Sequence, residues 1–314
     1  MKKLQFYLSG FLALQLVLAA GLFWREHRQQ ELQQQSEPLL ALQQEQLQRL
    51  EISADDNSVT LQKNAGEWQL PELHSLPVDA AKLDGLLDKL AEMRSGWPVA
   101  TTSSARERFE VGEEKFQKRL RLYSDGEVVA EFFIGTSPGF RWVHLRRAGD
   151  DAIYAVELNS YEMPAKGEEW LDKKLLAAGE PESISGPDYQ LRKVDGEWQF
   201  VAGDGELDVD KARELASAFS GLRIQKPAEE MPEAEPLEIR VATGGGELSY
   251  QFLRADEKYF VRRSDREQLF ELSRYDYERI ADLRRPQLVR TSEAEGESQQ
   301  TAEGSEENEE ATKS

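Results

Sequence analysis

The chain has 314 residues, a formal net charge of −20 and no cysteine. This length predicts about two domains, and 39% hydrophobic residues against 31% charged ones supply apolar side chains for a core in each. The acidic balance argues against binding nucleic acid, which requires clustered lysine and arginine, and the missing cysteine excludes disulfides, thiolate zinc sites and a cysteine nucleophile.

The N-terminus carries the clearest signal for localisation. After two lysines, residues 4–24 contain no charge, which is long enough for a helix to cross a hydrocarbon core of about 30 Å. Phe23 and Trp24 lie where an aromatic belt is expected at a membrane surface. The run is longer than the apolar core of an ordinary signal peptide, so 1–24 is expected to be an uncleaved anchor; a cleaved signal peptide is the alternative.

A glutamine-rich segment follows the anchor. Residues 25–49 contain nine glutamines with scattered leucines. This composition predicts a polar stalk broken near Pro38, and a coiled-coil dimerisation segment is the alternative.

An internal repeat organises the rest of the chain. The tetrapeptide Gly-Glu-Trp-Gln occurs at 66–69 and again at 196–199, inside a longer match. In each copy, turn residues separate two alternating stretches, which is typical of a β-hairpin. The predicted strands are 58–64 with 67–71 in the first copy, and 188–194 with 197–201 in the second.

Each predicted hairpin precedes an amphipathic helix. Residues 78–94 and 207–223 match in register, and Asp79 and Asp208 are the expected N-caps. Both helices place apolar residues at i, i+3, i+4, i+7 and i+10, on one helix face. These residues are Leu83, Leu86, Leu87, Leu90 and Met93 in the first helix, and Ala212, Leu215, Ala216, Phe219 and Leu222 in the second.

Further alternating segments and a short helix complete each copy. The closing helices are expected near 167–177 and 277–289. In the alignment of the two copies, Asp172 matches Asp282, and Trp170 matches Ile280 or Ala281. The predicted strands are 118–124, 127–135, 141–147 and 152–158, and then 237–243, 247–253, 259–265 and 268–274.

The sequence therefore predicts an α+β fold in tandem duplication. Each module consists of a β-hairpin, an amphipathic helix, an antiparallel β-meander and a short closing helix, and one N-terminal transmembrane helix precedes both. The modules span 50–178 and 179–290. The tail 291–314 holds eight Glu and one Lys without aromatic or branched aliphatic residues, so it is expected to be disordered.

Three short motifs resemble the bacterial domain of unknown function 4340 family. They are the G-x-W-x-L pattern at 66–70, the D-x-x-K-L helix start at 79–83, and a W-L-D-K-like close at 170–175. The resemblance covers about residues 50–290. It implies an envelope protein, often associated with ABC-type export machinery of the gliding-motility kind. It implies no catalytic residue. The orientation follows from the N-terminal run: a long body after such a run is translocated largely regardless of flanking charge, so a cytoplasmic N-terminus and a periplasmic body at the bacterial inner membrane are expected.

Motifs for chemistry are weak, and no cofactor or metal is expected. The three histidines lack metal-binding spacing, and the acidic stretch 203–210 fails the EF-hand pattern. Trp68 and Trp198 are interpreted as cross-strand packing residues, and Glu67 and Glu197 as solvated hairpin residues.

The remaining candidates form a weak partner or ligand surface, which is mainly basic. In an acidic protein such residues could bind an anionic partner or glycan; alternatively, they could keep edge strands from pairing with neighbours. The candidates are Arg119, Arg121, Trp142, His144, Arg146, Trp170, Arg262 and Arg263.

The leading functional hypothesis is a non-enzymatic, membrane-anchored envelope protein that acts as an accessory or scaffold subunit of an ABC-type transport system. Its expected partners are the membrane, through residues 4–24, and permease and ATPase subunits. One alternative is a membrane-tethered hydrolase or glycan-processing enzyme using cleft carboxylates. Another is a passive periplasmic binder of glycan or peptide, with an aromatic groove near Trp142 or Trp170.

Overall fold

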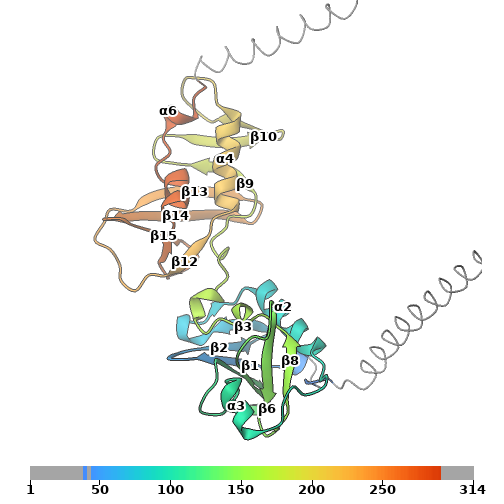
Figure 1. The fold of residues 1–314 in the computed structure, drawn as a ribbon. Coiled ribbons are helices and arrows are strands. Elements are labelled where there is room, and N and C mark those ends of the chain that lie inside the picture. The colour runs from blue at the N-terminus through green and yellow to red at the C-terminus, as the bar shows by residue number, and fades with distance from the viewer. Residues whose placement is uncertain (1–37, 41–43, 291–314) are drawn as a thin grey trace, which may run out of the picture. The chain divides into compact units, whose positions relative to one another are not determined.

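The computed structural model describes residues 38–40 and 44–290. The chain divides into two compact units, Met1–Asp172 and Lys173–Ser314, each built on its own antiparallel sheet with a few helices (Figure 1). The expected anchor and the acidic tail lie outside the described residues. Among the helices that are described, none combines the length and the apolar character needed to cross a membrane.

The first unit contains an eight-stranded sheet in the order β4-β3-β2-β1-β5-β6-β7-β8. Its strands are β1 (Arg49–Ala54), β2 (Asn57–Asn64), β3 (Glu67–Leu70), β4 (Leu76–Pro77), β5 (Lys118–Ser124), β6 (Glu127–Ile134), β7 (Trp142–Arg147) and β8 (Ile153–Glu157). Its helices are α2 (Ala80–Glu92) and α3 (Ser103–Arg108), with the short 3-10 helices η1 (Gln44–Gln46), η2 (Pro71–Leu73), η3 (Ser160–Glu162) and η4 (Gly167–Glu169).

The second unit repeats this plan in the order β11-β10-β9-β13-β14-β15-β16-β12. Its strands are β9 (Pro181–Ser185), β10 (Gln190–Val194), β11 (Glu197–Phe200), β12 (Ile224–Pro227), β13 (Leu237–Thr243), β14 (Gly246–Ala255), β15 (Lys258–Arg263) and β16 (Phe270–Leu272). Its helices are α4 (Val209–Ser220), α5 (Arg274–Ile280) and α6 (Arg285–Leu288), and α4 lies across β9, β10 and β13 (Figure 1).

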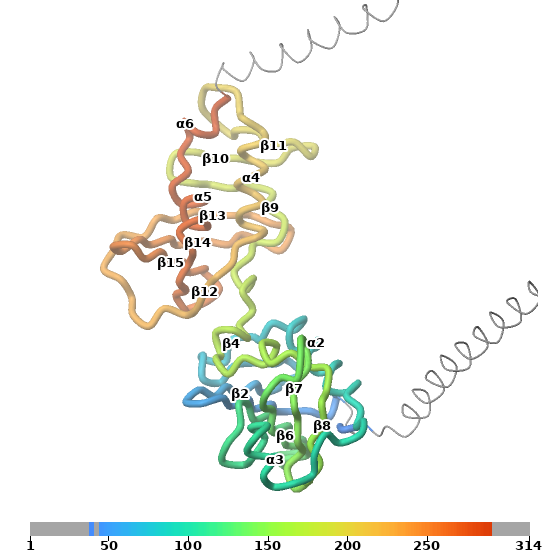
Figure 2. The backbone as a smooth tube through the Cα atoms, viewed as in Figure 1, coloured from blue at the N-terminus to red at the C-terminus, as the bar shows by residue number. Residues whose placement is uncertain are grey.

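The repeated tetrapeptide marks the same tight turn in both units. Ala65 and Gly66 have φ angles of 51° and 93°, and Asp195 and Gly196 have 51° and 92°. Two successive positive φ values are the signature of a type I′ turn, whose twist matches that of paired strands. The β2–β3 and β10–β11 hairpins are thus confirmed, and Figure 2 traces the second one at the edge of its sheet.

The two amphipathic helices are also confirmed. The side chain of Asp79 accepts a hydrogen bond from the backbone N–H of Lys82, and that of Asp208 accepts from the N–H groups of Asp210 and Lys211. The predicted apolar residues of the first helix are all buried. In the second helix Ala216 is only half-buried, and Ala218 is buried instead.

The described part of the expected stalk belongs to the first unit. Leu39, Leu40 and Leu47 are buried, and the N–H of Leu39 donates to the carbonyl of Met93 over 3.0 Å. The stalk prediction is therefore wrong for residues 38–40 and 44–49, because their leucines find a place in the core.

The prediction of a closing helix over 167–177 in the first copy is also wrong. Only η4 is helical there, and the chain then pairs with the segment before α2 through Trp170 and Asp172. The backbone N–H of Asp79 donates to the carbonyl of Trp170 over 2.7 Å, and that of Asp172 donates to the carbonyl of Pro77 over 3.0 Å.

The second unit closes with the same pair of bonds at different residues. The N–H of Asp208 donates to the carbonyl of Leu288 over 2.8 Å, and that of Arg290 donates to the carbonyl of Glu206 over 2.9 Å. Trp170 therefore corresponds to Leu288 and Asp172 to Arg290. The expected match of Asp172 with Asp282 is displaced by eight residues, because Asp282 lies between α5 and α6, before the segment that closes the unit.

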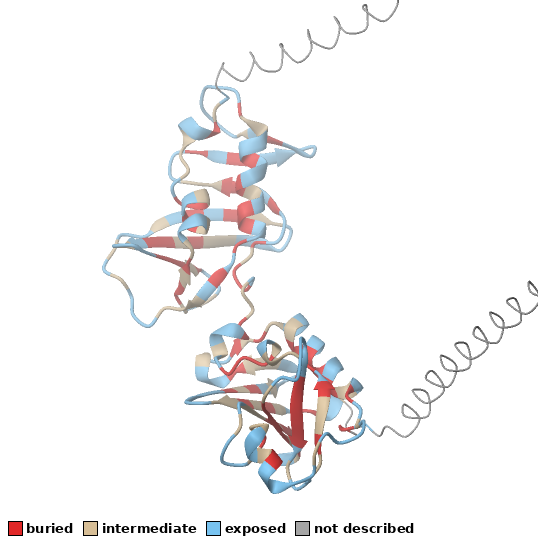
Figure 3. Cartoon of the chain, viewed as in Figure 1, coloured by how far each residue is buried: buried red, intermediate tan, exposed pale blue. Residues whose placement is uncertain are grey.

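The main core lies between each sheet and its helices, where the buried residues of strands and helix faces meet (Figure 3). The other face of each sheet is covered only in part. In the first unit a small cluster of Ala105, Val111, Phe133 and Ile153 covers it. In the second unit the cover is Leu253, Phe260 and Leu269. The uncovered remainder, called the open face below, presents polar side chains.

Candidate functional site

The open face of the first unit carries a connected network of charges on β1, β5 and β6. Arg119 and Arg121 both bond to Glu131, and Arg121 Nη1 also lies 3.6 Å from Glu51 Oε2. The Tyr123 hydroxyl donates to Glu51 Oε2 over 2.6 Å. Partial burial disfavours the charge of Arg121, but its bonds to Glu131 and Tyr123 prevail and raise its pKa. These side chains therefore hold one another in place on the sheet.

The open face of the second unit holds the equivalent positions on β9, β13 and β14. Arg240 Nε lies 2.9 Å from Glu238 Oε1, and the Ser249 hydroxyl donates to the same oxygen over 3.1 Å. The bonds from Arg240 and Ser249 lower the pKa of Glu238. Ser185 lies opposite Arg240 in the β9–β13 ladder, so it shares this face.

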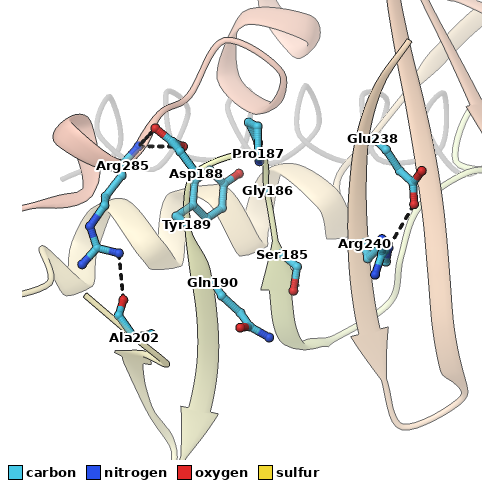
Figure 4. Close-up of a pocket in the computed structure, with 10 residues that line it drawn as sticks. All are labelled: Ser185, Gly186, Pro187, Asp188, Tyr189, Gln190, Ala202, Glu238, Arg240 and Arg285. Atoms are coloured by element: carbon cyan, nitrogen blue, oxygen red, sulfur yellow. Dashed lines mark hydrogen bonds and ion pairs between the residues drawn. The ribbon is translucent and has the colours of Figure 1, made fainter.

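A recess of about 520 Å³ opens beside these residues, at the turn between β9 and β10 (Figure 4). Asp188 accepts the backbone N–H of Arg285 over 3.1 Å, and the Arg285 guanidinium donates to the carbonyls of Ala202 and Asp204, each over 2.9 Å. These bonds tie the 201–206 loop to α6. The recess is lined by Ser185, Gly186, Pro187, Asp188, Tyr189, Gln190, Ala202, Glu238, Arg240 and Arg285.

The ring of Tyr189 packs against the backbone of Gly186 in the wall of the recess. The N–H of Gly186 donates to the carbonyl of Tyr189 over 3.0 Å, and a Cβ at Gly186 would lie 2.3 Å from the tyrosine ring, so only glycine fits there. Burial raises the pKa of Tyr189, followed in size by the effect of nearby Asp188. The phenol therefore stays protonated at neutral pH. The recess is lined largely by polar side chains and backbone.

Three of the candidate surface residues, Trp142, His144 and Arg146, lie on β7, and two of them lie under the small cluster of the first unit. Trp142 is half-open to solvent, whereas His144 and Arg146 are buried. Arg146 Nε donates to the carbonyl of Val111 over 2.8 Å, and its Nη1 donates to the carbonyl of Asp150 over 3.0 Å. Arg146 thus fastens the covering segment to the sheet.

His144 has a similar packing role. Its Nδ1 lies 2.8 Å from the carbonyl oxygen of Thr136, and its ring centroid lies 4.1 Å from that of Phe109. Since a carbonyl can only accept, Nδ1 carries the proton in this geometry. Burial lowers the pKa of His144, and the charge of Arg108 acts in the same direction.

Trp170 and Arg263 lie on the helix side of their sheets. Trp170 is fully buried, and its Nε1 donates to the carbonyl of Pro164 over 2.8 Å, so it does not line an open groove. Arg263 pairs with Asp265 and donates to the carbonyl of Ala177 over 3.0 Å. This pairing lowers the pKa of Asp265 and raises that of Arg263.

Of the eight predicted residues, the structure brings Arg119 and Arg121 together on one surface. Arg262 lies on the open face of the other unit, where it donates to Gln251 over 2.6 Å. The edge-strand interpretation is wrong, because β5, β7 and β15 each have neighbours on both sides.

Sequence reasoning missed Glu51, Glu131 and Glu238, the acidic partners in the open faces. The available signal was the alternation of acidic and basic residues on strands that pair directly, such as Arg121 opposite Glu131. The recess gave no such signal, since Asp188 and Arg285 are 97 residues apart. Within residues 38–40 and 44–290, no group of three or more His, Cys, Asp or Glu could hold a metal ion.

Comparison with known proteins gives one match. A family model described as "Domain of unknown function (DUF4340)" matches residues 68–240, more than half of the chain. The match runs from β3 of the first unit into β13 of the second, and it confirms the resemblance seen in the motifs. No curated protein and no solved structure matches the chain.

Proposed function

This chain belongs to the DUF4340 family, and from that premise we propose that it is a non-enzymatic, membrane-anchored envelope protein that binds partner proteins through the open faces of its sheets. Residues 4–24 would anchor it in the bacterial inner membrane with the body in the periplasm. The partners would be permease and ATPase subunits of an ABC-type system of the gliding-motility kind.

The observation that carries this proposal is the pair of open faces. Arg119, Arg121 and Glu131 in the first unit correspond by strand register to Glu238, Arg240 and Ser249 in the second. In both places the side chains are held by one another and remain uncovered by the described chain. Pre-ordered charges on a flat surface favour specific, electrostatically steered protein association.

The same correspondence supports tandem duplication. The order of seven strands, the type I′ turn, the N-cap aspartate and the closing pair of backbone hydrogen bonds recur in both units, which differ in their eighth, edge strand (β4 or β12). We infer that the units are two copies of one module, each of which kept its open face while the charges on it diverged. Two related but different surfaces suit a scaffold that contacts two different subunits.

The uncharged run 4–24 supports the anchor. It satisfies the length of about 20 residues that a spanning helix needs, and it ends at Trp24 and is followed by Arg25, which suit the membrane surface. The long body that follows would be exported regardless of the flanking charges.

The test is purification of the full-length protein from membranes, with quantification of co-purifying ABC permease and ATPase subunits. We expect the double variant Arg119→Glu, Arg121→Glu to lose about tenfold or more of this recovery, because it places like charges beside Glu131 and removes the basic half of the surface. The matched control is Arg147→Glu with Lys166→Glu, which changes the same charge at exposed residues elsewhere on this unit. Equal recovery with both double variants would contradict the proposal.

A further inference from the structure

Large aromatic side chains are exposed in the first unit. Trp97 is 73% exposed, Phe140 84%, Trp142 43% and Tyr161 87%. Folded domains bury most such residues, and a group of them in water is a mark of an interaction site. These four residues are called the aromatic end below.

The strand register brings them to one end of the sheet. Trp142 begins β7 and pairs with Glu157, the last residue of β8. Tyr161 follows four residues later, in η3. On the other side of β8, Ala100 bridges antiparallel to Ile153, so the chain leading back to Trp97 runs toward the Glu157 end.

The loop that presents Phe140 is built to hold it outward. The N–H of Trp142 donates to the carbonyl of Gly139 over 3.1 Å, which closes a tight turn. The Ser137 hydroxyl lies 2.6 Å from the carbonyl oxygens of both Gly139 and Trp142. Arg141 adopts a positive φ of 59°, which is unfavourable for a residue with a side chain. Phe140 is therefore displayed on an ordered tip.

The second unit lacks this feature at the equivalent place. Its β14–β15 connection is the two-residue turn Asp256–Glu257, closed by the pairing of Ala255 with Lys258. A loop of 135–141 with an aromatic tip thus stands where the other unit has two acidic residues. The fold does not require the aromatic residues, so another constraint acts on the first unit alone.

The place where the chain enters the first unit indicates what this constraint is. The described chain starts beside the C-terminal end of α2, where Leu39 bonds to Met93, and Lys89 of the same helix pairs with Glu162, next to Tyr161. The connection between the uncharged run 4–24 and Pro38 is residues 25–37, which reach at most about 45 Å when fully extended. The end of the unit from which this tether leaves is the aromatic end.

We propose that the aromatic end docks onto the surface of the bilayer in which residues 4–24 are anchored. Phe140 and Trp142 would enter the interface between headgroups and acyl chains, where amphipathic aromatic rings are favoured. Arg141, whose guanidinium lies 5.0 Å from the Phe140 ring centroid, would contact lipid phosphates. This inference rests on the proposed anchor and adds a second membrane contact that sets the orientation of the first unit.

The absence of cysteine allows a direct test on the full chain. Single variants Phe140→Cys and Tyr161→Cys would carry a fluorescent label, with Glu127→Cys as the control. Glu127 begins β6, and the loop 135–141 that carries Phe140 follows the last residue of β6. The length of the strand therefore separates Glu127 from this loop by about 23 Å. Each labelled protein would be placed in phosphatidylethanolamine–phosphatidylglycerol nanodiscs, and quenching by lipid-attached bromine would be compared with quenching by aqueous iodide.

We expect the ratio of lipid to aqueous quenching to be about threefold higher or more at both aromatic-end labels than at Glu127→Cys, since only interfacial side chains meet the lipid quencher. Adding Phe140→Asp to Tyr161→Cys should return its ratio to the control value. Ratios equal to the control in protein that resists carbonate extraction would overturn the docking but leave the anchor intact. Protein that is extracted by carbonate would overturn the anchor, and the docking with it.

A protein partner would give a different result. If the labels were shielded from both quenchers, and only when permease subunits were present in the disc, the aromatic end would be a protein contact. That outcome overturns docking to lipid while keeping the scaffold function.

Discussion

Arg146 shows how burial changes the role of a charged residue. Its side chain is 1% exposed and bonds to main-chain carbonyls of the segment that covers the sheet. Nearby Glu113 Oε1 lies 3.6 Å from Nη2, and the Phe133 ring centroid lies 4.8 Å from the guanidinium carbon. Burial, with the charge of Arg106, lowers the pKa of Arg146. The sequence placed Arg146 in a candidate partner surface, but the alternating pattern of a strand does not reveal which of its faces a distant segment covers.

Replacing Arg146 should therefore be costly. Arg146→Met removes the buried hydrogen bond to the Val111 carbonyl and the partly buried one to the Asp150 carbonyl, and we expect the free energy of unfolding to fall by about 3 kcal/mol or more. Urea unfolding would measure this loss. Arg147→Met, at the exposed neighbour, should change the value by about 0.5 kcal/mol or less. Similar losses for the two variants would show that the hydrogen bonds of Arg146 contribute little.

Because His144 is buried, we expect the stability of the protein to depend on pH. Since burial lowers the pKa of His144 in the folded state below the unfolded value of 6.5, the unfolded chain takes up a proton more readily. The stabilising contribution is complete above pH 6.5 and is lost as the pH falls through the folded pKa. We expect His144→Gln to reduce the drop in urea midpoint between pH 7 and pH 5.

The control for this experiment is His74→Gln, at an exposed loop position. The two variants compare the removal of a buried imidazole with the removal of an exposed one. A drop in midpoint that is the same in all three proteins would assign the effect to other groups.

At the scale of elements, the two amphipathic helices follow from local signals. Each begins at an aspartate that accepts N–H bonds of the first turn. We expect Asp79→Ala and Asp208→Ala each to lower the free energy of unfolding of their unit by about 1 kcal/mol, as measured by chemical denaturation. Asp84→Ala, at an exposed mid-helix position, is the control and should be neutral or slightly stabilising, because alanine favours helix. A loss at Asp84 as large as at Asp79 would remove the capping explanation.

The elements that sequence reasoning missed have weak local patterns. The central strands β1 and β9 contain few apolar residues. Leu50, Ile52 and Ile184 are fully buried, and polar side chains alternate with them. Both segments are strands because each lies between the predicted hairpin and the meander and supplies hydrogen bonds to both. Pairing with two neighbours is a property of the sheet and leaves little trace in a six-residue window.

The closing segments show the opposite error. Residues 167–177 have helical composition, yet Trp170 takes a buried position and its backbone pairs with the start of α2. Burial of a tryptophan outweighs a modest helix preference, because the apolar surface removed from water is large while propensity differences are a fraction of a kcal/mol per residue.

At the scale of the molecule, the units share one plan and differ in what they add to it. The first unit has the loop 135–141 with Phe140 at its tip. The second unit has the helices α5 and α6 and the recess that Arg285 lines. The proposed functions follow these differences: open faces for partner proteins in both units, and the aromatic end for the membrane in the first. The DUF4340 match begins in the first unit and ends in the second, so it is not confined to either one.

The sequence by itself determined the repeat, the two β-hairpins, the capped helices and the α+β class, because those signals lie within a few residues or recur at a fixed separation. Only the tertiary structure decided that Arg146 and Trp170 are buried, that Arg121 meets Glu51 and Glu131, and that Phe140, Trp142 and Tyr161 gather at one end. These arrangements depend on which strands become neighbours and which loops cover them. Contacts between segments far apart in the chain set that, and no local pattern records it.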